Sequence, residues 1–198
     1  MPPSIPPGGF AVKSLKNLAD RPAAAPLAAD DILEFHAGRL LLLLGICGGS
    51  TGAISGLTKM AKLDFFVRYP DFFAAVESKG APKTSARSHA VEAAMVRHHY
   101  GPWDKRYYHV LAYLEARRLI TVRISGRTCR IALTALGKGV VRKLLKSHAF
   151  RDLHTHMQRV NERFGRKTGN ELKTLIYETF GEEVAEQPLG HIIGGVRR

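Results

Sequence analysis

The sequence predicts a mainly helical protein that carries a single two-stranded β-hairpin. Apolar residues recur at intervals of three or four in several segments, which is the spacing of a buried helix face. Residues 119–124 and 127–133 alternate instead between apolar and polar side chains, as strands do, on either side of the turn pair Ser125-Gly126. A hydrophobic content of 45% over 198 residues is ordinary for a folded protein with its own core.

The chain begins with a proline-rich stretch. Residues 1–29 hold six of the ten prolines, which exclude a regular helix at the start, so we expect a flexible tail there. A domain over residues 30–148 then begins with a helix that Asp30 or Asp31 can cap. This helix is apolar nearly all round over residues 40–44. Such a helix belongs in the centre of a core or in a subunit interface.

The glycines between residues 48 and 52 do not form a nucleotide phosphate loop. That loop requires a lysine followed by Ser or Thr directly after its last glycine, whereas Leu57 follows Gly56 in this chain. We therefore interpret the stretch as a flexible connection between two helices. The pattern that follows predicts three helices and one polar surface loop, which are a helix over 55–70 that ends at Pro70, helices over 71–76 and 91–99, and a loop over 79–90.

The region around the hairpin organises the rest of this domain. Gly101-Pro102 predicts a turn, and Asp104 can cap a helix over residues 105–118. One face of that helix is apolar and should be buried, through Tyr107, Val110, Leu111 and Leu114. After the hairpin, Thr134 can cap a further helix. Helix, two-stranded wing and helix form a winged helix-turn-helix, so the predicted fold is mainly α with extra N- and C-terminal helices.

The pattern after the wing predicts helices to about residue 148, over 149–164 and over 170–180. We assign residues 149–180 to a C-terminal helical extension. The glycine-rich residues 181–198 are assigned to a tail.

Positive charge is concentrated in the same part of the chain as the hairpin. The formal net charge is +13, and residues 83–167 hold 19 Lys or Arg against five acidic residues, a balance of +14. Such a field attracts polyanions, which favours double-stranded DNA as a partner. A solvated basic surface, or a surface for an acidic protein, is the alternative.

The recognition helix and the wing provide the candidate DNA-binding residues. We predict that bases or phosphates are contacted from the helix, and the DNA backbone or minor groove from the wing, by Lys105, Arg106, His109, Arg123, Arg127 and Arg130. Arg117 and Arg118 are interpreted differently, as cations that favour the C-terminus of a helix.

No pattern of residues indicates catalysis, a metal or a cofactor. His154 and His156 fall on different faces of a helix, and Cys47 and Cys129 lack the spacing of metal ligands. Two isolated cysteines suggest a reduced, cytoplasmic protein. The longest apolar run, residues 40–47, is far shorter than the ~20 residues that span a bilayer. We therefore expect a non-enzymatic binding protein without a membrane segment.

The sequence around the hairpin resembles winged-helix proteins. The matching positions are Tyr108, Leu111, Leu114, Glu115, Leu119 and Ile120, followed by Leu133, Thr134 and Gly137. One position departs from the pattern. Most relatives place glycine just before the Leu-Ile pair to end the helix, whereas this chain has Arg118.

Three longer phrases resemble a narrower family. Residues 62–70, 97–104 and 172–178 are similar to the small middle components of ABC-type three-component systems, which include accessory subunits of Lamassu-type antiphage defence. The likeness covers about residues 32–180. It implies an adaptor bound to an SMC-like ATPase, beside an effector carried on another chain. The helix-and-wing pattern by itself leaves an alternative open, a sequence-specific transcriptional regulator that binds a palindromic site as a homodimer.

Overall fold

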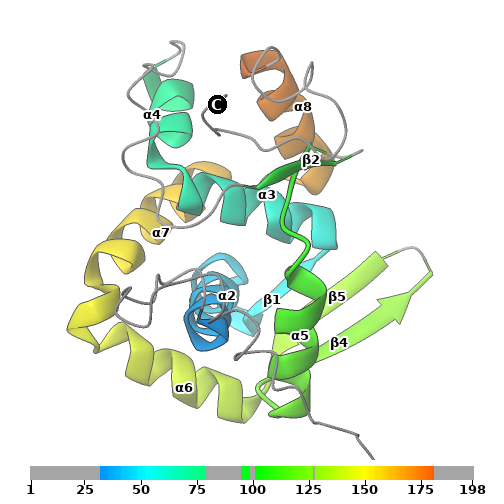
Figure 1. Ribbon diagram of the computed structural model, residues 1–198, viewed down its shortest axis with the longest axis vertical. Helices are drawn as coiled ribbons and strands as arrows, with labels where there is room; N and C mark the ends of the chain where they lie inside the picture. Colours follow the sequence, from blue (N-terminus) through cyan, green and yellow to red (C-terminus); the bar gives the residue numbers. More distant parts are fainter. Residues whose placement is uncertain (1–31, 79–94, 99–100, 127, 181–198) are drawn as a thin grey trace, which may run out of the picture.

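The computed structural model describes residues 32–78, 95–98, 101–126 and 128–180. Within these ranges the protein is mainly helical, with a three-stranded antiparallel sheet and a separate two-stranded hairpin (Figure 1). The prediction of a mainly helical protein is confirmed, whereas the strands are more numerous than the single two-stranded hairpin that we expected. The predicted tails and the predicted surface loop at 79–90 lie outside the described residues.

Helices precede and follow the hairpin over residues 120–133 along the chain. In order, the helices and strands are α2 (Leu33–Cys47), the 3-10 turn η2 (Gly49–Thr51), β1 (Ala53–Ser55), α3 (Leu57–Arg68), α4 (Pro70–Ser78), β2 (Val96–His98), β3 (Gly101–Trp103), α5 (Tyr107–Ala116), β4 (Ile120–Ser125), β5 (Thr128–Leu133), α6 (Ala135–Leu145), the 3-10 turn η4 (His148–Phe150), α7 (Arg151–Phe164) and α8 (Gly169–Thr179).

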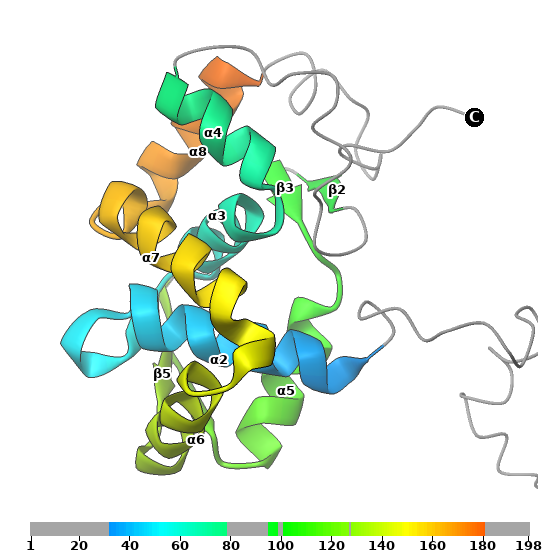
Figure 2. The same cartoon turned by 90° about the vertical axis from the view of Figure 1, so that its left-hand side faces the viewer.

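Helix α2 is the centre of the molecule. It lies between α7 on one side and α5 and the sheet on the other, with α3 and α6 above and below it (Figures 1 and 2). Residues 40–44 are almost completely buried, which agrees with their apolar character on all sides. The prediction of a core position for this helix is therefore confirmed.

The connection between α2 and α3 contains a strand that the sequence did not reveal. β1 pairs antiparallel with β5, so that Ile54 lies opposite Ile131 and Ser55 opposite Arg130. The backbone N–H of Gly56 also donates to the carbonyl of Cys129 at 2.7 Å. The interpretation of this stretch as a flexible connection was wrong. The sheet order β1-β5-β4 instead joins the β4–β5 hairpin to the connection between the two helices.

The stretch before α5 also differs from its prediction. We expected a helix over residues 91–99 and a turn at Gly101-Pro102, but Val96–His98 and Gly101–Trp103 are strands β2 and β3 of a hairpin. The turn pair lies inside β3, where Pro102 contributes its carbonyl oxygen to the Lys62 ammonium at 3.0 Å. Proline has no N–H to donate to a ladder, and it is tolerated in a two-stranded hairpin because every strand there is an edge.

Helix α5 is shorter than predicted, but its buried face is the predicted one. Asp104 does not cap the helix as predicted, because Arg106 occupies the N-cap position and no side chain caps there; the Asp104 carboxylate instead accepts the backbone N–H of Arg106 at 2.9 Å, just before the helix begins. Trp103 packs next to this position, with its ring 6.0 Å from that of Tyr108. The four apolar residues predicted to face inward are all less than 9% exposed, namely Tyr107, Val110, Leu111 and Leu114.

The last two helices pack on α3, and the residue just after α8 also contacts α4. Phe164 of α7 lies against Phe66 of α3, with ring centroids 4.5 Å apart, and Phe180 lies against Phe72 of α4 at 4.8 Å. The side chain of Thr168 and that of Glu171 form a reciprocal capping box at the start of α8. The apolar side chains of both helices belong to the same buried cluster as those of α2 and α3.

Candidate nucleic-acid interface

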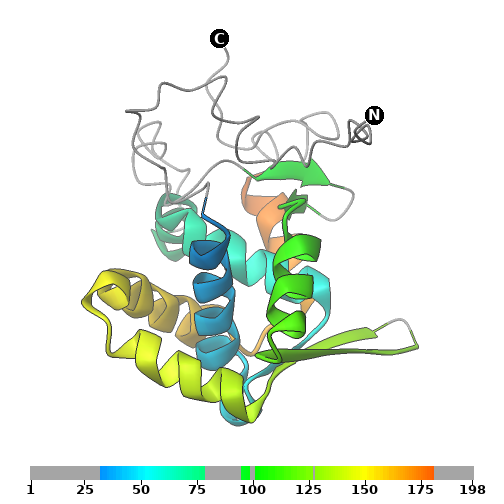
Figure 3. The same ribbon diagram turned by 60° about the horizontal axis from the view of Figure 1, so that its bottom comes forward.

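The hairpin of β4 and β5 projects from the body of the protein beside α5 (Figure 3). Its strands pair so that Arg123 lies directly opposite Arg130. Ser55 of β1 continues this row, because it pairs with Arg130 on the other side. All three residues are exposed. One face of the sheet therefore presents two adjacent guanidinium groups to solvent.

Two like charges at directly opposed positions destabilise a pair of strands. Neither Arg123 nor Arg130 forms an ion pair with any residue that the structure describes. An anion bound between the two groups would remove their repulsion, as a phosphate does when it accepts hydrogen bonds from arginines. Arg127, the third predicted residue of the wing, lies outside the described part of the chain.

Helix α5 exposes only part of the predicted recognition surface. Lys105, two residues before the helix begins, and His109 in its first turn are exposed. Arg106 instead turns its guanidinium towards the protein, where Nη2 lies 2.7 Å from Oδ2 of Asp104 and Nη1 lies 3.0 Å from Nε2 of His36. The structure thus leaves Lys105 and His109 on the outer face, and commits the Arg106 side chain to contacts within the protein.

Asp104 is the carboxylate around which this end of α5 is built. It accepts a hydrogen bond of 2.7 Å from the buried guanidinium of Arg68, in addition to those from Arg106. Burial alone would raise the pKa of Asp104, but the hydrogen bonds from Arg106 and the charge of Arg68 outweigh it and hold the pKa well below the ordinary value. Asp104 therefore stays ionised and fixes the start of α5 on α3.

A second buried carboxylate, Asp64, joins three helices. It accepts two hydrogen bonds from Arg39 of α2, at 2.8 and 3.2 Å, and one from the hydroxyl of Tyr107 of α5 at 2.7 Å. Arg68 lies between the two carboxylates, 4.0 Å from Asp64. Opposite charges alternate along this cluster, which is why it can be buried at all. The predicted recognition helix is therefore held to α2 and α3 by charge as well as by apolar packing.

The C-terminal end of α5 has an unusual backbone. Arg118 adopts a left-handed conformation, with φ of 57°, and it is the one non-glycine residue among those described with a positive φ. The N–H of Arg118 donates to Glu115 and that of Leu119 to Leu114, which is the pattern of a Schellman motif. Glycine usually occupies this position. Arg118, the residue that departs from the winged-helix pattern, therefore has a backbone conformation that is unfavourable for any residue except glycine.

Helix α6 carries a group of cations that the sequence reasoning did not select. Lys138, Arg142, Lys143 and Lys146 are all exposed, and none of them forms an ion pair with a described residue. The signal is present in the sequence, since residues 116–151 contain ten Lys or Arg and no acidic residue. The helix-and-wing pattern assigns this charge to the recognition helix and the hairpin, whereas much of it lies on α6.

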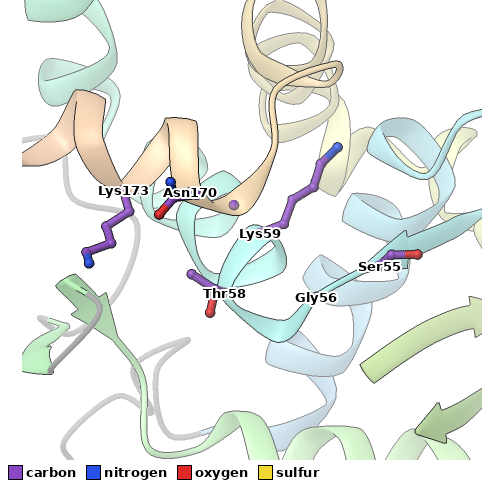
Figure 4. A pocket seen from close by; sticks show the side chains of 7 residues that line it. Ser55, Gly56, Thr58, Lys59, Asn170 and Lys173 are labelled. Atoms are coloured by element: carbon purple, nitrogen blue, oxygen red, sulfur yellow. The ribbon is translucent and has the colours of Figure 1, made fainter. Parts of the chain in front are cut away.

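A cavity of about 240 Å³ lies where α3 and α8 begin (Figure 4). Thr58, Lys59, Asn170 and Lys173 are among the residues that line it. Lys59 points away from Thr58 and Asn170 in Figure 4, and its ammonium donates to the carbonyl of Gly165 at 2.8 Å. The cavity does not bring together any of the predicted DNA-binding residues.

The described residues also bear on three other possibilities, namely a metal site, a reactive thiol or imidazole, and a membrane-spanning helix. No group of three or more His, Cys, Asp or Glu residues is placed to hold a metal ion there. Cys47 and Cys129 are both free thiols, and burial raises the pKa of Cys47 to about 12. His156 is engaged within the fold, since its Nε2 donates to the carbonyl oxygen of Phe66 at 2.9 Å. None of the helices described is long and apolar enough to cross a bilayer.

Comparison of the chain with known proteins returned no match to any protein-family model, any curated protein or any solved structure.

Proposed function

We propose that this chain is a winged-helix protein that binds double-stranded DNA, and that it serves as a non-enzymatic adaptor of an SMC-type ATPase complex in antiphage defence. The observation that carries the DNA part is the pair Arg123 and Arg130. Two exposed guanidiniums face each other across a hairpin, and neither forms an ion pair with a described residue. The phosphate backbone of DNA is the partner that such a pair fits best.

The order of the elements supports a winged helix. A hairpin follows α5 directly, and it is anchored at its base by β1, which lies between α2 and α3. One feature departs from a short helix-turn-helix, because α4 and the β2–β3 hairpin are inserted between α3 and α5. The Arg68–Asp104 and Asp64–Tyr107 contacts fix α5 on α3 in place of a tight turn.

The adaptor role is supported by the resemblance of three phrases in the sequence. The phrase at residues 62–70 is buried over residues 62–69 and supplies Lys62, Asp64 and Arg68 to the core. Its likeness therefore supports a shared fold more directly than a shared partner surface. Co-expression with a candidate SMC-type ATPase from the same organism, followed by size-exclusion chromatography, tests the role. We expect one co-eluting complex, and separate elution would contradict it.

DNA binding is tested by fluorescence anisotropy with a labelled duplex of about 30 base pairs over roughly 50 to 300 mM salt. We expect the logarithm of the affinity to fall linearly with the logarithm of the salt concentration, because phosphate contacts release counterions. The double variant Arg123→Gln/Arg130→Gln should make this dependence less steep, reducing the magnitude of the slope by about 2. A slope near zero for the unmodified protein would overturn the DNA part of the proposal.

A sequence-specific regulator is the second candidate, and the exposed face of α5 favours it. Lys105 and His109 are free to reach base edges from the N-terminal end of the helix. The expected signature is a stable homodimer with a preferred palindromic site. Lys105→Ala/His109→Ala should then reduce the preference for that site while leaving binding to random duplex almost unchanged. Arg106→Ala is less informative, since its side chain also supports Asp104.

A further inference from the structure

The outward side of α6 carries a row of cations opposite its buried side. Val141 packs against α2 at Gly45 on the buried side. On the other side, three exposed cations are spaced at intervals of four residues, namely Lys138, Arg142 and Lys146. Lys143 is also exposed and lies beside this row. Successive members of the row are about 6 Å apart along the helix, so the row is about 12 Å long.

The fold does not require this arrangement of charge. Like charges four residues apart destabilise a helix, and the row contains two such pairs. Arg142 and Lys143 lie in the last turn, where cations are favourable, but Lys138 lies near the N-terminus, where they are not. The nearest acidic residues in the sequence, Glu115 and Asp152, lie outside the helix on either side.

A glycine at the centre of the row provides an independent observation. Gly139 lies inside α6, where glycine weakens a helix relative to alanine. A Cβ atom at Gly139 would meet only the end of the Arg142 side chain, at 3.9 Å, so no contact within the described protein demands glycine. Gly137 provides the contrast, because a Cβ there would lie 2.0 Å from the carbonyl oxygen of Leu119.

We propose that the outer face of α6, consisting of Gly139, Lys138, Arg142, Lys143 and Lys146, is a docking surface for the sugar-phosphate backbone of double-stranded DNA, separate from the wing. The missing side chain at residue 139 lets the backbone of the ligand approach the helix between the cations. A duplex presents one charge about every 1.7 Å along its axis, so a row about 12 Å long meets several phosphates together. The inference rests on the proposed function in that DNA is the partner of both surfaces.

The first test separates binding from folding. Gly139→Ala should raise the urea midpoint of unfolding, because alanine is the better helix former. It should also weaken binding of the same duplex by several-fold, because the methyl group stands between the helix and the DNA backbone. A variant that is more stable and binds more weakly cannot be explained by loss of structure. Binding equal to that of the unmodified protein would contradict the role of Gly139.

The second test uses charge-neutralising variants in the same salt titration. Lys138→Gln/Arg142→Gln should lower the slope by about 2 and the affinity at about 150 mM salt on the order of 10-fold. Arg163→Gln/Arg166→Gln removes the same charge from exposed positions at the end of α7 and after it, and it should leave the slope unchanged.

The outcomes distinguish this inference from the proposed function. If the α6 variant binds DNA with the slope of the unmodified protein while Arg123→Gln/Arg130→Gln lowers it, the inference fails and the proposed function stands. If the unmodified protein shows no salt-dependent binding to the duplex, the proposed function fails and the inference fails with it. Loss of a protein partner from the α6 variant, with DNA binding intact, would assign this face to an acidic protein instead.

Discussion

At Arg118 the backbone adopts a conformation that favours glycine, although the residue carries a long charged side chain. Its left-handed conformation costs an L-amino acid roughly 1 to 2 kcal/mol, a cost that glycine does not carry. The guanidinium is exposed and makes no ion pair with a described residue. The resemblance to winged-helix proteins singled out this position, because most relatives have glycine there, whereas the periodicity of the helix gives no information about φ.

Replacing Arg118 by glycine should stabilise the protein by about 1 kcal/mol, since glycine adopts this conformation without strain. The free energy of unfolding, measured by urea denaturation, provides the test. Arg117→Gly is the matched control, because Arg117 has a negative φ of −82° and the same change there should destabilise the protein. Equal effects of the two substitutions would show that backbone strain at Arg118 is negligible.

Lys62 is a buried ammonium whose hydrogen bond ends on the carbonyl of Pro102. Burial, together with the charge of Lys173, lowers its pKa from 10.5 to about 7. Between these two values the unfolded chain holds a proton that the folded chain lacks. Folding therefore releases a proton in this range and becomes more favourable as the pH rises.

The unmodified protein should gain stability relative to Lys62→Met as the pH rises from about 7 towards 10. The expected gain is up to about 1.4 kcal/mol per pH unit, since one proton is linked to unfolding. Below about pH 7 the difference should become constant. Urea denaturation of both proteins at several pH values measures it. A difference independent of pH would mean that Lys62 keeps an ordinary pKa in the folded protein.

At the scale of elements, α5 depends on buried charge for its position. Asp104 connects Arg68 of α3 to Arg106 at the start of α5. Removing one member of such a cluster leaves the opposite charges buried without compensation. The sequence contains a trace of this arrangement, because Asp64 and Arg68 are four residues apart in a helix that is otherwise mainly apolar. It does not reveal that Asp104 lies next to them.

Asp104→Asn should destabilise the protein by about 3 to 5 kcal/mol, because asparagine cannot neutralise Arg68. Glu77→Gln is the control, since it breaks an ion pair of 2.6 Å with Arg159 that is exposed to solvent and should cost less than about 1 kcal/mol. Thermal and urea unfolding of the two variants gives the comparison. Similar losses in both would indicate that the Asp104 cluster contributes no more than a surface pair.

Strands were predicted well only where they are long. β4 and β5 each have six residues, and their alternation marked them in the sequence. β1 has three residues among glycines, which is too short to establish a period. β2 was mistaken for part of a helix, because Val96–His98 has no alternation to distinguish the two. β1 is a strand because it pairs with β5, which is far away in the sequence, and β2 is a strand because it pairs with β3, which is close. Neither pairing can be recognised from such short segments of sequence.

At the scale of the whole molecule, the C-terminal helices complete the core. The buried apolar residues of α7, of α8 and of the position just after α8 are Met157, Val160, Phe164, Leu172, Ile176 and Phe180. Each contributes roughly 1.5 to 3 kcal/mol, so together they match the whole stability of a typical domain, about 5 to 15 kcal/mol. The periodicity of these helices was visible in the sequence, but their packing on α3 was not.

A chain shortened to end at residue 148 should therefore lose cooperative unfolding. Phe66 and Phe73 would be exposed, since both pack against Phe164 in the intact protein. Binding of the dye ANS and near-UV circular dichroism would report the change. This experiment also tests the predicted domain boundary. A shortened chain with a sharp thermal transition would establish residues 30–148 as an independent domain.

The burial of α2 on every side constrains how this protein can vary. Residues 36–44 are buried without interruption, so the helix has no solvent-facing register in which replacements are harmless. A saturation mutagenesis survey along most helices gives tolerance that rises and falls every three to four positions. Along residues 36–44 we expect tolerance to be uniformly low, so that new variants accumulate on the periphery while this segment stays nearly fixed.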